Sequence, residues 1–188
     1  MEEAMNWREK SGRPLIREAR TEDCRQIGEL ALELIRLEHS LNEGTGEPTP
    51  WAGSAAEIRK QMARPSTKFL VAERDGTLIG YARVDLHGIN QGGGRLSRLA
   101  RQLFDKLTRR PRASFFASGG VISGILVAAT ERRTRVGHQL VEAAAEWLRL
   151  QGVSQVYIHV LQNNLPALRF WEGSGFEPVT IVLRKELK

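Results

Sequence analysis

The clearest chemical pattern in the sequence is a basic run that follows an apolar stretch. Residues 121–129 are mostly apolar, and the chain continues as Glu131-Arg-Arg-Thr-Arg-Val-Gly137 before apolar residues with helical spacing begin. A helix start presents unpaired amide groups and the positive end of the helix dipole, and both favour an anion. The guanidinium groups of Arg132, Arg133 and Arg135 suit phosphate oxygens geometrically. The run predicts a site for a phosphate-bearing ligand, with a solvated arginine-rich loop as the alternative. It is not a Walker loop, because it lacks the glycine and Lys-Ser/Thr pattern.

A second block downstream separates these two interpretations. It reads Asn164-Leu-Pro-Ala167-Leu-Arg-Phe-Trp171-Glu-Gly-Ser-Gly175-Phe176. Together the two blocks resemble the GNAT acetyltransferases, whose hallmark is a Gln/Arg-x-x-Gly-x-Gly/Ala loop between a strand and a helix, followed by Asn-x-x-Ala-x-x-x-Tyr-x-x-x-Gly-Phe. The resemblance covers the chain from about residue 14 to the C-terminus, apart from one insert.

The resemblance implies acetyl-CoA as co-substrate. The main chain of Ile125, Leu126 and Val127 would pair with the amides of the pantetheine arm, as an added strand does. Further cofactor contacts are implied for the loop, whose amides would hold the pyrophosphate, and for two residues of the second block: Arg132, Arg133, Thr134, Arg135, Val136, Gly137, His138, Asn164 and Trp171. Asn164 has the alternative role of capping the helix that follows it. Trp171 has the alternative role of a core aromatic residue.

Two residues depart from the family pattern. Arg135 stands where the first loop glycine is expected, and its Cβ is costly if its φ is positive. Trp171 stands at the tyrosine position, and in the family the tyrosine phenol is often placed to protonate the departing thiolate. An indole N–H scarcely ionises and cannot do this. A tyrosine-type general acid at this position is therefore excluded.

His159, five residues before Asn164, is the predicted catalytic base. Some family members that acetylate protein N-termini carry a catalytic glutamate at that spacing, and an imidazole with a pKa of about 6.5 can take a proton from an ammonium group, directly or through water. The alternative is a hydrogen-bonded, half-buried strand histidine. Asp85 and His87 are second-choice candidates. The side chains of His39, His138 and Cys24 show no partner pattern and are expected to be structural or surface groups.

The elements that must position these residues follow from periodicity and turn chemistry. Strands are predicted over residues 15–19, 68–73, 77–86, 115–129, 155–161 and 176–184, the fifth of them apolar enough to be covered on both faces. The second and third are joined by the hairpin turn Asp75-Gly76. Helices are predicted after Thr21, after Ser54 to about residue 65, from Val136 to Gly152, and over residues 164–172 with Pro166 in the first turn.

Composition bounds the class of protein. The 188 residues are 41% hydrophobic and 27% charged, which fits one globular domain, predicted over 14–188 after an N-terminal extension over 1–13. The single Cys24 cannot form an internal disulfide, and no Cys/His cluster has zinc-ligand spacing, so no metal is expected. No apolar run approaches the roughly 18 residues of a membrane span, and we expect a cytoplasmic protein.

The net charge of +6 comes from one segment. The segment 95–112 contains one acidic residue, Asp105, and seven basic residues: Arg95, Arg98, Arg101, Lys106, Arg109, Arg110 and Arg112. We predict a basic helical insert over about 88–114, which could clamp the acceptor, bind an acidic partner or form a dimer contact. The alternative is a solvated helix face packed by its leucines.

The sequence therefore predicts an α/β fold of the GNAT type, with a mixed, largely antiparallel sheet splayed between its fourth and fifth strands and helices on both faces. The predicted function is acetyl-CoA-dependent N-acetylation by direct transfer to an amine. Small amines, antibiotics, peptide N-termini and lysine all fit, because the loop over 40–53 and the insert carry no signature. A homodimer is compatible with the sequence. The alternative function is a non-catalytic module that binds coenzyme A or a polyanion.

Overall fold

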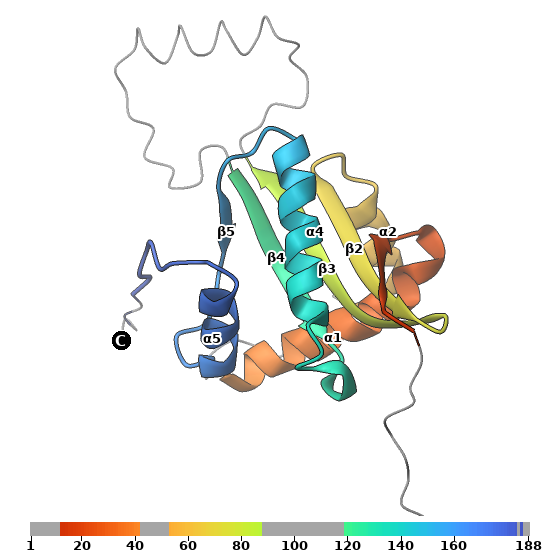
Figure 1. The fold of residues 1–188 in the computed structure, drawn as a ribbon, viewed down its shortest axis with the longest axis horizontal. Coiled ribbons are helices and arrows are strands. Elements are labelled where there is room, and N and C mark those ends of the chain that lie inside the picture. The colour runs from red at the N-terminus through yellow and green to blue at the C-terminus, as the bar shows by residue number, and fades with distance from the viewer. Residues whose placement is uncertain (1–11, 42–52, 88–118, 184, 186–188) are drawn as a thin grey trace, which may run out of the picture.

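The computed structural model describes residues 12–41, 53–87, 119–183 and 185 (Figure 1). The first half contains β1 (Leu15–Glu18), the 3-10 helix η1 (Thr21–Asp23), α1 (Cys24–Leu41), α2 (Ala55–Met62), β2 (Thr67–Arg74) and β3 (Thr77–His87). The second half contains β4 (Gly119–Val127), the 3-10 helix η2 (Ala129–Glu131), α4 (Val136–Leu150), β5 (Val156–Ile158) and α5 (Leu165–Gly173). The predicted N-terminal extension, the basic insert and most of the 40–53 loop lie outside the described residues.

The five strands form one sheet in the order β1-β2-β3-β4-β5. The first four are antiparallel neighbours, and β4 and β5 are parallel. The hairpin between β2 and β3 turns at Asp75 and Gly76, whose φ angles of 51° and 75° are both left-handed, as the Asp-Gly pair predicts. The predicted mixed, largely antiparallel sheet is confirmed.

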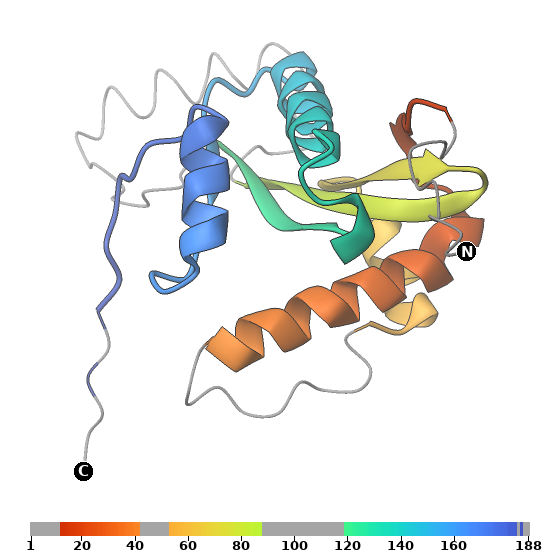
Figure 2. The same ribbon diagram turned by 60° about the horizontal axis from the view of Figure 1, so that its bottom comes forward.

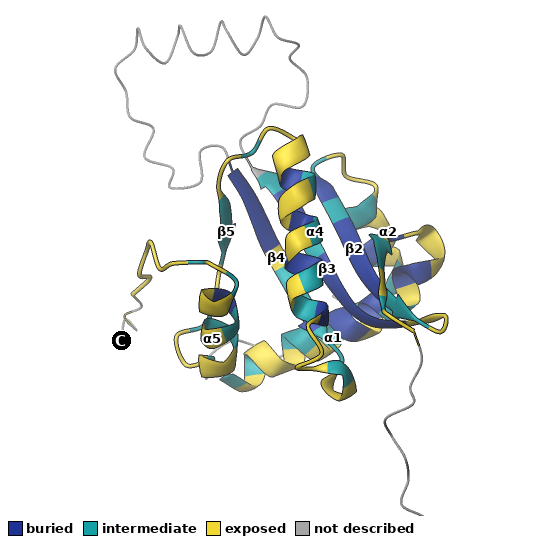
Figure 3. Ribbon diagram, viewed as in Figure 1, coloured by how far each residue is buried: buried dark blue, intermediate teal, exposed yellow. Residues whose placement is uncertain are grey.

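Helices cover both faces of this sheet (Figure 2). On one face, α1 and α2 pack Ile27 and Ile58 against Val71 and Tyr81. On the other, α4 packs a stripe that includes Leu140 and Leu148 against alternate residues of β2, β3 and β4, and α5 joins the edge of the same cluster. The buried strands between the two helical layers are dark blue in Figure 3. The predicted two-sided arrangement is confirmed.

Helix starts agree with the sequence at two of three predicted caps. The Ser54 hydroxyl accepts the amide of Glu57 at 3.2 Å. Thr21, in contrast, does not cap α1 but begins the 3-10 turn η1. There the carboxylate of Asp23 accepts the amide of Arg20 at 2.6 Å, and it also accepts the Arg17 guanidinium. Asp23 thus ties the start of the turn to Arg20 and Arg17, and Thr21 lies inside the turn instead of before it.

Two predicted strands differ from the structure. The fifth covers only Val156–Ile158 of the predicted 155–161, and its residues are half-buried instead of covered on both faces. The sixth is absent from the described residues 176–183, where Ile181, Val182 and Leu183 are all more than 80% exposed. An apolar run becomes a strand only beside a partner strand, and none lies beside this segment in the described chain. The predicted strand over 115–129 is observed over 119–127, and 115–118 lie outside the described residues.

Candidate active site

A gap in the sheet opens between β4 and β5. The two strands share three pairs, the last joining Ile122 and Ile158. Beyond this pair, Ile125, Leu126 and Val127 pair with β3 alone. Their outward main-chain amide and carbonyl groups face no other strand in the described chain. This is the predicted splay, and it leaves the edge of β4 without a partner strand in the described chain at the three residues predicted to pair with pantetheine.

The basic loop connects this edge to α4. Arg133 and Arg135 have φ angles of 65° and 69°, in the left-handed region that residues other than glycine rarely adopt. Arg135 occupies the N-cap position of α4 without a capping side-chain hydrogen bond. The side chain at the N-cap position therefore accepts none of the first-turn amides of α4, such as those of Val136 and Gly137. Left-handed non-glycine residues concentrate at functional sites, and an uncapped helix start suits an anion.

Contacts with three other elements hold the loop in place. Glu131 forms an ion pair with Arg74 of β2, and both side chains are about 15% exposed. The Thr134 hydroxyl donates to the Glu131 carbonyl at 2.5 Å. Arg132 donates through Nε to the carbonyl of Val127 at 3.2 Å and contacts the Glu33 carboxylate of α1 at 3.4 Å. The loop is thus anchored at its base while its arginines stay exposed.

Gly137 of α4 lies against the Phe170 ring of α5. A Cβ at this position would lie 3.0 Å from the Phe170 ring, which is tighter than most contacts between packed groups, so the ring would have to shift. The His138 ring packs edge-on against the same ring, with centroids 4.9 Å apart. Trp171 contacts both Phe170 and Phe176 and is only 7% exposed. Trp171 therefore takes its alternative role as a core aromatic residue, and its contact with a cofactor stays a prediction.

Asn164 caps α5. Its side-chain oxygen accepts the amide of Ala167 at 3.2 Å, and Pro166 lies in the first turn, as predicted. The neighbouring Asn163 donates its side-chain amide to the Leu41 carbonyl at the end of α1. The segment after β5 is therefore joined to the C-terminus of α1.

His159 lies directly after β5 and is exposed. The expectation that it sits within a strand buried on both faces is wrong, because β5 ends at Ile158. Its position is still informative. It is the first residue past the last pair between β4 and β5, so it lies where the gap begins. Of the second-choice bases, Asp85 is described below, and the side chain of His87 lies outside the described residues.

Asp85 is the centre of a polar cluster that the sequence did not reveal. Its carboxylate accepts the Thr67 hydroxyl of β2 at 2.6 Å and the Ser123 hydroxyl of β4, and Arg83 contacts it at 2.9 Å. Burial alone would raise the pKa of Asp85, but these hydrogen bonds and the Arg83 charge hold it below its usual value. Asp85 is therefore an ionised, fully engaged group, and its low pKa makes it a poor base.

Tyr81 of β3 lies next to this cluster, against Gly124, the residue of β4 that follows Ser123. A Cβ on Gly124 would lie 3.2 Å from the Tyr81 hydroxyl oxygen and 3.6 Å from Leu34 of α1. Burial, and secondarily the negative charge of Glu38, raise the pKa of Tyr81. Glycine at 124 therefore lets a neutral phenol reach the β4 backbone at the mouth of the gap.

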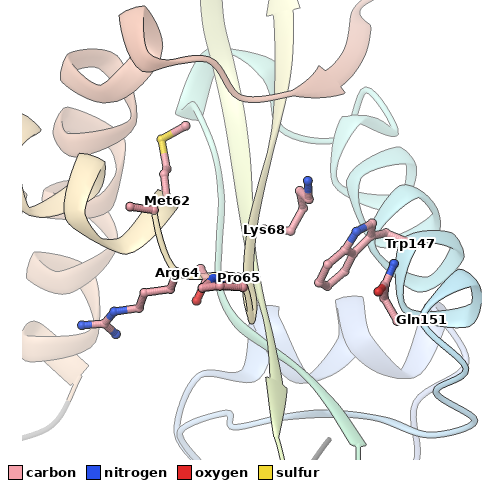
Figure 4. Close-up of a pocket in the computed structure, with 8 residues that line it drawn as sticks. Met62, Arg64, Pro65, Lys68, Trp147 and Gln151 are labelled. Carbon is pink, nitrogen blue, oxygen red and sulfur yellow. The ribbon is translucent and has the colours of Figure 1, made fainter. Parts of the chain in front are cut away.

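A separate pocket lies at the opposite end of α4 (Figure 4). It has a volume of about 330 Å³, and Trp147 and Gln151 line it together with Arg64, Pro65 and Lys68. The Lys68 ammonium lies 5.8 Å from the centre of the Trp147 ring. Ten helical residues separate Trp147 from Gly137, or about 15 Å at 1.5 Å per residue. None of the predicted site residues lines this pocket. In the described part of the chain no group of three or more histidine, cysteine or acidic side chains could hold a metal ion.

Comparisons with known proteins agree with this geometry. The family model described as the acetyltransferase (GNAT) family matches residues 29–176. GCN5-related N-acetyltransferase 6 of Arabidopsis thaliana is 38% identical over 60 residues, and the N-acetyltransferase YobR of Bacillus subtilis is 28% identical over 81 residues. These alignments span 32% and 42% of this chain, but only 21% and 33% of the two relatives.

Solved structures match over nearly the full length. The aminoglycoside N-acetyltransferase AAC(6')-Iy in complex with CoA has a TM-score of 0.68 at 17% identity, covering 96% of this chain and 98% of its own. The aminoglycoside 6'-N-acetyltransferase AAC(6')-IG from Acinetobacter haemolyticus has a TM-score of 0.65 at 16% identity, covering 93% and 98%. At these identities the likeness shows the fold. No helix in the described ranges is both long and apolar enough to cross a membrane.

Proposed function

The chain belongs to the GNAT acetyltransferase family, and on that premise we propose that it transfers an acetyl group from acetyl-CoA directly to an amine. One observation carries the proposal. The edge of β4 that β5 leaves free at Ile125–Val127 leads straight into the anchored loop and the uncapped start of α4. A main-chain edge that ends at an anion-binding helix start suits a ligand with amide groups at one end and phosphates at the other.

The residues present fit acetyl-CoA. The main chain of Ile125, Leu126 and Val127 would hold the pantetheine amides. The amides from Arg133 to His138 would hold the pyrophosphate, with the exposed guanidinium groups of Arg132, Arg133 and Arg135 around it. When bound, acetyl-CoA supplies the acetyl group as a thioester, and its C–S bond breaks as the C–N bond to the acceptor forms. Positioning two reactants in one gap supplies much of the rate gain.

His159, or water held by it, takes the proton that the acceptor amine loses. Its place at the mouth of the gap supports this role. The thiolate leaving group takes a proton from solvent, since the Trp171 indole cannot donate one in its place. No acetyl-enzyme is proposed, because Cys24 is buried in α1.

An amine acceptor is supported by the structural neighbours, several of which are aminoglycoside acetyltransferases. The proposal does not distinguish an antibiotic, a small amine or a peptide amine as the acceptor, since most of the 40–53 loop and the insert lie outside the described residues. Two features favour the rival function, a CoA-binding module without turnover. They are the left-handed backbone of Arg135 and the tryptophan at position 171, where the family has tyrosine. Release of free thiol from acetyl-CoA with any amine of a panel excludes the rival.

The cofactor site is tested with two charge-matched variants. Reversing Arg132 and Arg133 to glutamate should weaken calorimetric CoA binding at least tenfold, because each lost charge-assisted hydrogen bond costs about 1.5–3 kcal/mol. Reversing Arg25 and Arg149 to glutamate changes the net charge equally at exposed sites away from the loop, and should leave binding unchanged. Equal affinity in the two double variants contradicts the site.

A further inference from the structure

Ser123 is an extra residue in β4. The pairing register between β3 and β4 shifts at this point. Arg83 is paired with Gly124 and Val84 with Ile122, so Ser123 has no pairing partner on β3. It also lies one residue past the last pair with β5. Ser123 is therefore a β-bulge residue at the start of the gap, and it is exposed. Bulges beside active sites re-aim a side chain.

The bulge turns Ser123 toward the α1 and α2 face. Before it, Gly120 and Ile122 face α4, and after it Ile125 and Val127 pack on that same side. The hydroxyl of Ser123 instead reaches Asp85, which shares its face with Thr67 and with Arg83. Arg83 in turn donates to the side-chain oxygen of Gln61 in α2 at 3.0 Å. Ser123 thus faces the gap from the side opposite α4.

The bond to Asp85 fixes what the Ser123 hydroxyl can do. A hydroxyl has one proton to donate and two lone pairs to accept with. A carboxylate accepts only, so the proton of Ser123 is committed to Asp85. Thr67 and Arg83 hold that carboxylate in place from the other side. Toward the gap, the Ser123 oxygen can only accept a hydrogen bond.

We propose that Ser123 is the subsite for the acceptor amine, whose N–H donates to its hydroxyl oxygen. The inference rests on the proposed function and adds a binding group to it. Holding one N–H on Ser123 orients the nitrogen so that its lone pair faces into the gap, while a second proton faces His159 or water. The acceptor enters from the α1 and α2 face. It must carry a primary amine, because a neutral primary amine has one N–H for Ser123 and a second for His159 or water, whereas a neutral secondary amine has only one.

Two other roles for Ser123 make different predictions. As a nucleophile it would need Asp85 to take its proton, and a carboxylate held by three partners is a poor base for that step. As a purely structural residue it would act only through its bond to Asp85. Thr67 makes the same kind of bond to the same carboxylate, but it is 6% exposed and lies on β2, outside the gap. Thr67 therefore provides a matched control.

The experiment compares Ser123→Ala with Thr67→Val, each of which removes one hydroxyl bond to Asp85. The panel contains kanamycin, spermidine and an alanine-initiated tripeptide, and the amine with the fastest thiol release is the probe. Ser123→Ala should raise KM for that amine roughly tenfold, because one hydrogen bond to the amine is lost. It should leave KM for acetyl-CoA within about twofold of the wild-type value. Thr67→Val should leave both KM values within about twofold. Ser123→Thr, which keeps the hydroxyl, should restore most of the affinity and guards against a folding defect.

The outcomes separate the inference from the function on which it rests. Equal amine KM in the alanine and valine variants, or an acetyl group on Ser123 by mass spectrometry, overturns the subsite while acetyl transfer stands. If no amine releases thiol from the wild-type protein, the proposed function fails first. The subsite then stands or falls on titration of the protein with ethylammonium. An amide shift at Ser123 that is lost in Ser123→Ala supports it, and no shift overturns it.

Discussion

The two sides of the gap are built from different kinds of groups. On the α4 side, the candidate cofactor site consists of main-chain amides and exposed arginines around Gly137. On the α1 and α2 side, Ser123 and Asp85 belong to a side-chain network that joins three strands and α2. Main-chain groups survive most substitutions, whereas a hydroxyl or carboxylate does not. We therefore expect the cofactor side to depend on backbone shape and the acceptor side on individual side chains.

The largest effect is expected at His159. His159→Ala should lower turnover by about 10²- to 10⁴-fold, the usual contribution of a positioned base, and leave acetyl-CoA affinity nearly unchanged. The wild-type rate should rise with pH where a general base loses its proton, and this limb should vanish in the variant. Steady-state kinetics against pH measure both. A limb that survives and follows the pKa of the amine would assign it to the acceptor, and turnover within a few-fold of wild type would demote His159 to a structural residue.

A smaller effect is expected when the backbone shape of the cofactor side changes. Gly137→Val should weaken calorimetric CoA binding roughly 10- to 100-fold by blocking phosphate approach. It should also cost about 1–3 kcal/mol of unfolding free energy, because its Cβ meets the Phe170 ring. The double variant with Phe170→Ala relieves that contact. If it regains CoA affinity, Gly137 acts through packing of α4 on α5 and not through the phosphate.

A third prediction concerns acid stability. Because the folded pKa of Asp85 is below its usual value, its ionised form stabilises the protein above about pH 4, and this contribution is lost as pH falls through the folded value. Asp85→Asn should lower the urea midpoint at pH 7 and flatten its fall below pH 4. Asp23, whose pKa the hydrogen bonds from Arg17 lower despite burial, is the comparison. Asp23→Asn should also flatten the fall of the urea midpoint below pH 4, but it should leave KM for the amine unchanged. Asp85→Asn should raise KM for the amine.

The smallest effect is expected at Arg135. Its φ of 69° is a conformation that glycine adopts without strain. Arg135→Gly should therefore raise the unfolding free energy by up to about 1 kcal/mol and leave CoA affinity equal or tighter. Thermal melting and calorimetry measure the two. A large loss of affinity would show that the Arg135 side chain itself holds phosphate, and the cofactor side would then depend on side chains as the acceptor side does.

The parts of the fold that local sequence determines are those that the sequence predicted. The hairpin at Asp75-Gly76, the caps at Ser54 and Asn164, and the loop that ends at Gly137 each depend on residues within a few positions of one another. The strand expected over 176–184 failed because its apolar residues need a partner strand, which periodicity does not supply.

The acceptor side escaped prediction for a related reason. Ser123 and Asp85 lie 38 positions apart, and their contact depends on a bulge in the pairing of β3 with β4. No pattern within either strand records that pairing shift. A serine one residue before Gly124 was the only local signal, since glycine within a strand often marks a bulge.

The bulge also decides which changes in chain length β4 can accept. Ile122 and Ile125 pack on the same side although two residues lie between them, where regular alternation allows one or three, so one residue between them is surplus. Removing Ser123 alone would leave every other side chain of β4 on its present face and give a more regular sheet. Removing a residue of β4 outside the stretch from Ile122 to Ile125 would instead invert the side chains of one part of the strand. Deleting one residue would thus give a regular β4, whereas the irregular strand carries the Ser123 hydroxyl at the gap.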